Sequence, residues 1–256
     1  MISKNQIKFI KSLENKKVRY REGLFIAEGP KVVGDLLAEG FKPHTLVAVE
    51  GWSYNYKGIA INADFVVTEE ELRKVSFLQH PQQVIGVFPI PTNSIEHIDT
   101  SNNLVLALDD VQDPGNLGTI IRIADWFGIS NILCSEKTAD AYNPKVVQAT
   151  MGSIARVELH YVDLPQFIAS HADKVPVYGT FLDGKNIYSN ELSANGIIVM
   201  GNEGNGISNE IAKQINRRLF IPYYPENRHT AESLNVAIAT AITCAEFRRR
   251  RLSMKN

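Results

Sequence analysis

The stretch Ile197-Ile198-Val199-Met200-Gly201-Asn202-Glu203-Gly204-Asn205-Gly206-Ile207-Ser208 sets the architecture of this chain. Four apolar residues end abruptly in a turn that holds three glycines, an acid and two amides, and Ser208 is placed to cap a following helix. This order predicts a buried strand whose carboxyl end opens into a loop where the backbone can approach a ligand closely. Because ligands of open α/β sheets sit beyond the carboxyl ends of strands, we expect a binding loop here; a plain surface turn is the alternative.

The sequence around this stretch alternates between apolar runs and helical periodicity. Further strands are expected at residues 104–108, 131–134, 156–160, 176–181 and 218–222, and helices at 117–128, 143–149 and 232–252. A polar turn is expected at 109–116, before the first of these helices. The run at 104–108 is nearly continuous and apolar, which is typical of a strand buried on both faces. The second half of the chain therefore predicts an α/β fold with a mostly parallel sheet covered by helices.

The first 90 residues predict a smaller α/β unit of their own. Strands are expected at 24–27, 44–49, 63–67 and 83–88, and helices at 5–13, at 30–40 and after a cap at Thr68. Two prolines and small polar residues at 89–94 indicate a linker. We therefore expect one domain at 1–90, a linker at 91–103 and a larger domain at 104–256.

Composition excludes several classes of protein. The chain has 256 residues, of which 44% are hydrophobic and 21% charged, as is ordinary for a soluble protein. No apolar run approaches the roughly 20 residues that span a bilayer, and no apolar segment of a secretory signal follows the start. Cys134 and Cys244 are far apart, which predicts a reducing, cytoplasmic setting without disulfides. Neither the cysteines nor the histidines have the spacing of metal ligands, so we expect no metal. Because no apolar run is long enough to span a bilayer, we also expect no membrane association.

The net charge of −1 hides two basic segments. The first 31 residues hold eight lysines and arginines against three glutamates, and four consecutive arginines occupy 248–251. Such segments suit a polyanionic partner, and solvated helix faces are the alternative.

Three polar clusters lie at expected strand-to-helix junctions: 116–124, 199–208 and 221–237. Arg122 stands between Ile121 and Ile123, so a fully exposed, purely solvated side chain is the less favoured interpretation, and arginine can hold an RNA phosphate in a bidentate manner. Glu203 could pair with an arginine, accept from a ligand or cap a helix. On spacing alone, Ser233 and Asn235 are expected to cap the last helix.

At these clusters the chain resembles the SpoU/TrmH-type RNA ribose 2′-O-methyltransferases of the SPOUT superfamily. The motifs NLGTIIRIA (116–124), VMGNEGNGIS (199–208) and IP…SLNVAIA (221–239) carry the resemblance, in the family's order and spacing over about residues 104–252. The first domain more loosely resembles the small ribosomal-protein-like RNA-binding module that often precedes this catalytic domain, through its length, its strand alternation and FIAEGPKVV (25–33).

The resemblance implies a fold, a cofactor and partners. The larger domain would carry a C-terminal trefoil knot, an exception to the rule against threaded chains, and would bind S-adenosyl-L-methionine in a homodimer. By similarity the cofactor pocket is lined by Thr180, Met200, Gly201, Ile221 and Leu234. By similarity the catalytic residue is Arg122, positioned together with the substrate by Asn116, Glu203, Ser233 and Asn235. The separate first domain favours ribosomal RNA over tRNA.

The role of Arg122 stays open between a base and an electrostatic, positioning group. Arginine has a pKa above about 12 and is a poor free base. We favour a guanidinium that lowers the pKa of the 2′-hydroxyl and orients the adjoining phosphate. The loop 223–232 is longer than is usual in the family, and its candidate RNA contacts are Tyr223, Tyr224, Arg228 and His229; a cover for the dimer or the knot is the alternative.

Other readings of the glycine-rich stretch fit less well. A nicotinamide-binding enzyme needs G-x-G-x-x-G after the first strand of a βαβ unit, and a P-loop NTPase needs Gly-Lys followed by Ser or Thr. Neither pattern is present at 201–206. The stronger rival is a non-catalytic RNA-binding member of the same fold, against which the retained polar residues of the three motifs argue.

Overall fold

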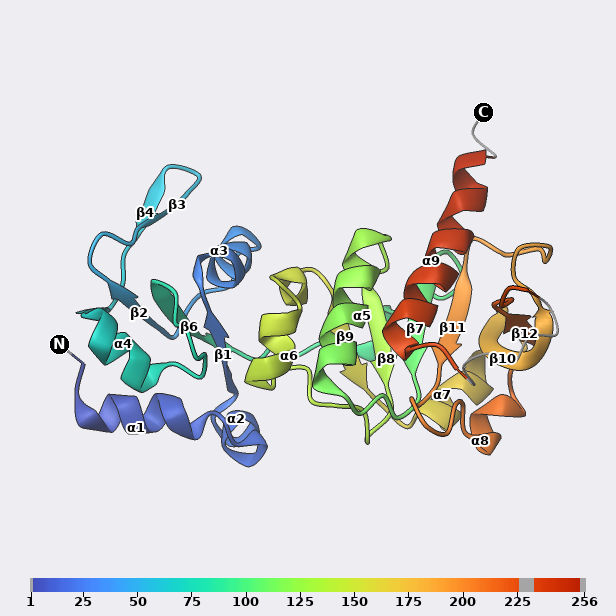
Figure 1. Ribbon diagram of the computed structural model, residues 1–256, viewed down its shortest axis with the longest axis horizontal. Coiled ribbons are helices and arrows are strands. Elements are labelled where there is room, and N and C mark those ends of the chain that lie inside the picture. Colours follow the sequence, from blue (N-terminus) through green and yellow to red (C-terminus); the bar gives the residue numbers. More distant parts are fainter. Residues whose placement is uncertain (1, 226–232, 254–256) are drawn as a thin grey trace. The chain divides into compact units, whose positions relative to one another are not determined.

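The computed structural model describes residues 2–225 and 233–253, and the chain divides into two compact units (Figure 1). Unit 1 comprises Met1–Thr92 and Asp140–Arg156, and unit 2 comprises Asn93–Ala139 and Val157–Asn256. The candidate RNA contacts Arg228 and His229 lie outside the described residues.

Unit 1 is built on a mixed sheet whose described strands have the order β1-β6-β2-β5. Its elements are α1 (Lys4–Ser12), α2 (Lys16–Glu22), β1 (Leu24–Glu28), α3 (Pro30–Ala38), β2 (Thr45–Val49), β3 (Tyr54–Tyr56), β4 (Ile59–Ile61), β5 (Phe65–Val67), α4 (Glu69–Val75), β6 (Val84–Pro89), α6 (Pro144–Ala149) and the 3-10 turn η2 (Ser153–Ala155). Strand β6 runs antiparallel to both β1 and β2, whereas β5 is parallel to β2. Thr68 caps α4 as expected, in a reciprocal pair with Glu71.

Helix α2 is absent from the sequence-based expectations because the side chain it buries is that of an arginine. The Arg19 guanidinium, which is 1% exposed, pairs with the Asp140 carboxylate and donates to the carbonyl oxygens of Leu13 and Glu14 at 2.8 and 2.6 Å. A stripe of apolar side chains would have marked the helix, but a buried ion pair leaves no such pattern. This pair is one of the contacts that hold the segment Asp140–Arg156 within unit 1.

Unit 2 is built on a sheet whose six described strands have the order β12-β10-β11-β7-β8-β9. Its elements are η1 (Ile95–His97), β7 (Leu104–Leu108), α5 (Pro114–Trp126), β8 (Asn131–Cys134), β9 (Glu158–Tyr161), α7 (Leu164–His171), β10 (Val177–Asn186), β11 (Gly196–Met200), α8 (Asn209–Ala212), β12 (Arg217–Phe220) and α9 (Val236–Ser253). Each neighbouring pair is parallel, which confirms the expected sheet.

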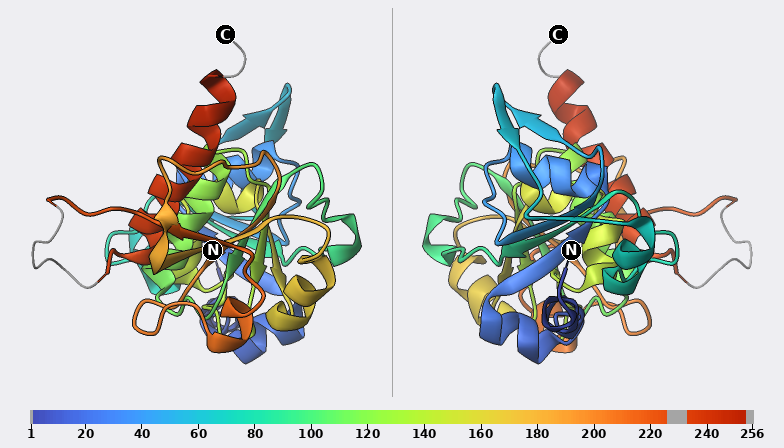
Figure 2. Two further views of the ribbon diagram at one scale, coloured as in Figure 1. Left: turned by 90° about the vertical axis from the view of Figure 1, so that its right-hand side faces the viewer. Right: turned by 90° about the vertical axis from the view of Figure 1, so that its left-hand side faces the viewer.

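Helices cover both faces of this sheet. On one face, Leu164 and Ile168 of α7 and Ile211 of α8 join a core cluster with alternate residues of the strands. On the other face, Tyr178 of β10 meets Phe247 of α9 edge to face, with ring centroids 4.8 Å apart. Helices α5 and α9 contact each other along this face, and the left view of Figure 2 shows α9 (red) and α7 (yellow) on opposite sides of the sheet. Within the described ranges, every helix is too short or too polar to cross a membrane.

Two helix starts differ from the sequence-based expectation. Helix α5 begins at Pro114 rather than at residue 117, because the Asp113 carboxylate accepts from the Asn116 N–H at 2.7 Å and caps the helix. Asn116 therefore lies inside α5 and not in the polar turn before it. Helix α9 begins at Val236 rather than at residue 232, because the Asn235 Oδ1 accepts from the N–H of Ala237 at 3.0 Å.

Candidate active site

Four residues expected to line the cofactor pocket lie at one edge of the unit 2 sheet. Strands β12, β10, β11 and β7 are neighbours and parallel, so their carboxyl ends meet there. Thr180 lies in β10, Met200 ends β11 and Gly201 follows it directly. Ile221 follows the last residue of β12. Three distant parts of the sequence thus contribute to one edge of the sheet.

A chain of side-chain hydrogen bonds joins the three sequence motifs. The Asn235 Nδ2 donates to the Asn116 Oδ1 at 2.9 Å, and the Asn116 Nδ2 donates to the Glu203 Oε1 at 2.9 Å. Glu203 also accepts longer bonds from the backbone N–H groups of Gln112 and Asp113, at 3.5 and 3.4 Å. Because the side-chain amide of Asn116 has both an acceptor oxygen and donor hydrogens, it can accept from Asn235 and donate to Glu203 at the same time. Asn235 also caps α9, as its spacing predicts.

Asn202, which sequence reasoning did not single out, organises the glycine-rich turn. Its Oδ1 accepts from the N–H groups of Gly204 and Asn205 at 2.9 and 3.0 Å, and its Nδ2 donates to the carbonyl of Asp110 at 2.7 Å. Its backbone also bridges to Gly206. An asparagine two residues before a glycine is a known turn signal and could have identified it.

Gly201 is the position where this turn needs a glycine. A Cβ atom there would lie 2.2 Å from the backbone carbon of Gly206, which is far inside van der Waals contact. At Gly204 the nearest atom to such a Cβ, the Asn202 Oδ1, would be 3.6 Å away, an ordinary contact. Gly201 therefore allows the two ends of the turn to approach each other.

Asp109, at the end of β7, also escaped the sequence analysis. Asp109 is only 5% exposed, and its Oδ2 accepts from the backbone N–H of Ser208 at 2.7 Å. Ser208 has the expected cap position before α8, but its side chain makes no capping bond among the described residues. The buried carboxylate of the neighbouring strand holds this residue instead. An acid directly after an apolar strand is the signal that marks it.

The structure does not bring Arg122 to this network. Arg122 is exposed on α5, and six residues at about 100° each place it about 120° around the helix from Asn116. Among the residues that the structure describes, no side chain or carbonyl accepts from its guanidinium. Ser233 is exposed as well and forms no side-chain hydrogen bond with any described residue. Within the described part of the chain, these two predicted site residues therefore have no side-chain partner.

The cofactor expected from the sequence fits the chemistry of this edge. Leu182 in β10 and Leu234 before α9 are 76% and 51% exposed, so the chain leaves apolar side chains uncovered close in sequence to Thr180 and Asn235. An adenosyl group needs apolar cover and backbone partners rather than charges, and Thr180, Met200, Gly201, Ile221 and Leu234 carry no charge. Those residues would hold it.

The chain's thiols are not suited to nucleophilic chemistry. Burial raises the pKa of the Cys134 thiol, and burial raises the pKa of Cys244 to about 12. Both thiols are therefore neutral at pH 7, and a thiol is a poor nucleophile in that form. Within 2–225 and 233–253, no three His, Cys, Asp or Glu side chains converge as metal ligands.

Comparisons with known proteins identify the family and the fold that this chain resembles. Residues 103–245 match the profile of the SpoU rRNA Methylase family, and residues 4–86 match the MRM3-like substrate binding domain. The 23S rRNA (guanosine(2553)-2′-O)-methyltransferase of Bacillus subtilis is 33% identical over 250 residues, which cover 96% of this chain and 97% of the relative. A TrmH-family protein from Porphyromonas gingivalis has a solved structure with a TM-score of 0.84 and 41% identity, covering 98% of this chain and 99% of its own. The structure of an AdoMet-bound rRNA methyltransferase from Sinorhizobium meliloti gives 0.83 and 31%, with 98% and 97% covered.

Proposed function

Because the chain belongs to the SpoU rRNA methylase family, we propose that it transfers the methyl group of S-adenosyl-L-methionine to a ribose 2′-hydroxyl of ribosomal RNA. The observation that carries the proposal is the hydrogen-bonded chain Glu203–Asn116–Asn235, which joins all three family motifs at the carboxyl edge of the sheet. Relatives that match along nearly the whole chain are named for 2′-O-methylation of 23S rRNA, which favours ribosomal RNA over tRNA.

The reaction asks little covalent chemistry of the protein. When bound, S-adenosyl-L-methionine supplies an electrophilic sulfonium methyl group. The 2′-oxygen forms a bond to the methyl carbon while the carbon–sulfur bond breaks, its electron pair stays on sulfur, and the hydroxyl proton leaves. The protein therefore contributes mainly alignment and proton removal. Asn116, Glu203, Ser233 and Asn235 position the substrate, and Arg122 lowers the pKa of the hydroxyl and orients the neighbouring phosphate, which assists the loss of the proton.

The placement of Arg122 supports a homodimer. Arg122 lies about 120° around α5 from Asn116, and Trp126, four residues further along the helix, is 83% exposed. Residues four apart share a helix face, so an exposed apolar ring and an arginine without a partner among the described residues lie on one face of α5, which a second copy would cover. We place Arg122 at the site of that second copy. Sedimentation equilibrium tests this pairing, and a monomer at working concentration would overturn it.

The family resemblance also supports a trefoil knot in unit 2. The strand order β12-β10-β11 places β10 between two later strands, which agrees with a chain that crosses itself at this edge. The knot belongs to the proposal, and a crystal structure that traces 221–236 without a threaded loop would remove it.

Unit 1 is proposed to bind the RNA. Its N-terminal part matches the MRM3-like substrate binding domain over 4–86, and exposed lysines and arginines line α1 and α2. Positive charge of this kind binds the phosphate backbone irrespective of sequence. We keep the domain limits 1–90 and 104–256 for the two functions, with the segment Asp140–Arg156 contributing to unit 1. The proposed compartment is the cytoplasm, where bacterial ribosomes are assembled.

Transfer of tritiated methyl groups from S-adenosyl-L-methionine to purified RNA tests the function. We expect label in 23S rRNA, at a ribose whose 2′-O-methylation blocks alkaline cleavage, and none in tRNA. Label in tRNA alone would move the substrate to tRNA. RNA binding without any label would leave the non-catalytic alternative.

A further inference from the structure

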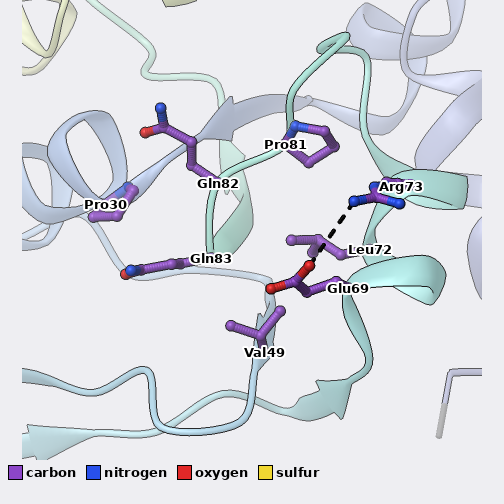
Figure 3. Close-up of a pocket in the computed structure, with 8 residues that line it drawn as sticks. All are labelled: Pro30, Val49, Glu69, Leu72, Arg73, Pro81, Gln82 and Gln83. Atoms are coloured by element: carbon purple, nitrogen blue, oxygen red, sulfur yellow. Dashed lines mark ion pairs between the residues drawn. The ribbon is translucent and has the colours of Figure 1, made fainter.

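A cavity of about 290 Å³ lies in unit 1, and none of the residues assigned to methyl transfer lines it. It opens between the start of α3, the end of β2, helix α4 and the segment that leads into β6 (Figure 3). Pockets for drug-sized ligands occupy about 300–1,000 Å³, so this one lies at the lower limit of that range. It therefore has room for a single planar ring system rather than for a whole cofactor.

The cavity wall combines apolar surfaces with two side-chain amides. Val49, Leu72 and Pro81 supply the apolar part. Gln82 and Gln83 supply the amides and are both exposed; Figure 3 shows them on the side of Pro30, opposite α4. Each amide offers two donor hydrogens and one acceptor oxygen. Among the described residues, neither amide forms a hydrogen bond with another side chain, so both can serve a ligand.

The backbone of the glutamine pair is held in an uncommon conformation. Gln83 has φ of 42°, in the left-handed region that residues other than glycine rarely adopt. Its carbonyl accepts from the N–H of Val49 at 2.9 Å, which ties it to the end of β2. The Gln82 Oε1 lies beside Gly29 at the start of α3, 3.7 Å from where a Cβ atom would stand, which is an ordinary contact. Backbone strain of this kind is found preferentially at binding sites.

The opposite rim of the cavity carries a cation. Arg73 on α4 is joined to Glu69 by a long contact of 3.9 Å, and their side chains are 66% and 82% exposed. An exposed pair with this geometry is weak, so the guanidinium can exchange Glu69 for a phosphate. Figure 3 shows this pair on the α4 side, across the cavity from Gln82 and Gln83.

We propose that this cavity receives one unpaired nucleobase of the RNA substrate, with adenine preferred. The apolar wall would cover the base, the amides of Gln82 and Gln83 would pair with its edge, and Arg73 would hold a flanking phosphate. A glutamine amide donates and accepts side by side, which matches an adenine edge, and proteins read RNA sequence mainly at unstacked bases. The inference rests on the proposed function, in which unit 1 binds the RNA substrate through its positive charge. The cavity would add a preference for a particular nucleobase to that binding.

Fluorescence anisotropy with labelled 12-nucleotide oligo(A), oligo(C) and oligo(U) tests the cavity on the full chain. The variants are Gln82→Ala and Gln83→Gly, since glycine accepts the backbone conformation of residue 83 without strain. Gln79→Ala, in the same exposed segment but outside the cavity wall, is the control. We expect the wild type to bind oligo(A) more tightly than oligo(C) or oligo(U). Each variant should lower the affinity for oligo(A) about tenfold and abolish this preference, whereas the control should change neither the affinity nor the preference.

A matched pair on α4 tests the phosphate contact. Arg73 and Lys74 are adjacent, exposed and each paired with a glutamate one helical turn earlier, but only Arg73 is among the residues that line the cavity. Arg73→Glu and Lys74→Glu change the net charge equally. We expect Arg73→Glu to lower the affinity for all three oligonucleotides several-fold more than Lys74→Glu does.

Methyl transfer to 23S rRNA distinguishes failure of the base-binding cavity from failure of the proposed methyltransferase function. A rise in KM without a change in kcat or in cofactor affinity for Gln82→Ala supports the cavity. Equal binding of the three oligonucleotides by the wild type, or variants that match it in both assays, overturns the cavity and leaves methyl transfer intact. A wild type that methylates no RNA overturns the proposed function, while the oligonucleotide preference still decides whether the cavity binds a base.

Discussion

The side chain of Asn235 donates a hydrogen bond to that of Asn116 over 2.9 Å, although 119 positions separate the two in sequence. Asn235 caps the closing helix α9 with its oxygen and holds the first motif with its nitrogen. One residue thereby links the start of a helix to the network that contains Glu203. The correct folding of the site and the capping of α9 are therefore coupled.

Asn116→Asp should damage methyl transfer. The substitution places a carboxylate where an N–H donates to Glu203 at 2.9 Å, so attraction becomes repulsion between like charges. We expect kcat/KM to fall at least about tenfold, the equivalent of roughly 1.4 kcal/mol. Adding Glu203→Gln restores a donor between the two positions and should recover part of the loss. Steady-state kinetics of both variants measure this, and full activity of the single variant would show that the bond has no role.

Gly201→Ala should abolish cofactor binding, whereas Gly204→Ala should be tolerated. The methyl group at 201 would lie 2.2 Å from Gly206, so the turn must open, but the one at 204 would meet its nearest atom at 3.6 Å. Isothermal titration with S-adenosyl-L-methionine compares the two variants. Equal affinities would mean that the closed turn is unnecessary for binding.

Asp109→Ala should loosen the glycine-rich turn. The change leaves the Ser208 N–H without its acceptor at a part-buried position, so the cost in stability should be about 1 kcal/mol, the lower end of the usual range. Cofactor affinity should fall with it. Asp109→Asn keeps one oxygen and should lose less. The control Ser208→Ala should change neither quantity, because the contact to Asp109 uses the backbone. If the control is as damaging as Asp109→Ala, the hydroxyl carries the effect instead.

Arg19→Met should destabilise unit 1. It leaves the Asp140 carboxylate buried without its cation, and breaking a buried pair in this way costs about 3–5 kcal/mol. Urea unfolding, with each unit followed by its own probe, should show an earlier transition in unit 1 only. Replacing both partners, as Arg19→Met with Asp140→Leu, should recover part of the stability. A double variant less stable than the single one would show that Asp140 is stabilised by other groups, such as the Tyr20 hydroxyl, which donates to its Oδ1 at 3.1 Å.

Most of the unit 2 sheet follows from the sequence, because its strands are short apolar runs bounded by polar turns. The strand β7 is predicted at its observed limits, Leu104–Leu108. The start of α5 is not, because a cap at Asp113 is one side-chain bond that periodicity does not register. The cap of α9 at Asn235 is predicted by spacing, but the helix expected from residue 232 begins four residues too early. Helix α2 is missed for a related reason, since it buries an ion pair.

The candidate site is only partly predictable. Resemblance to a family brings Asn116, Glu203 and Asn235 together, and the structure supplies the bonds between them. The side chains of Asn202 and Asp109 accept from backbone N–H groups, and only local signals mark them: an asparagine two residues before a glycine and an acid directly after an apolar strand. The separation of Arg122 from Asn116 around α5 depends on where the helix starts, and that is the point at which the sequence-based boundary was wrong.

Transfer of labelled methyl groups to 23S rRNA by the wild type and by Arg122→Ala tests the central claim most directly. We predict 2′-O-methyl label with the wild type and none with the variant, even though both bind S-adenosyl-L-methionine with the same affinity. The account holds that the loops bind the methyl donor and that the Arg122 guanidinium activates the ribose hydroxyl. It would be contradicted if the variant labelled the RNA at the wild-type rate or no longer bound the cofactor.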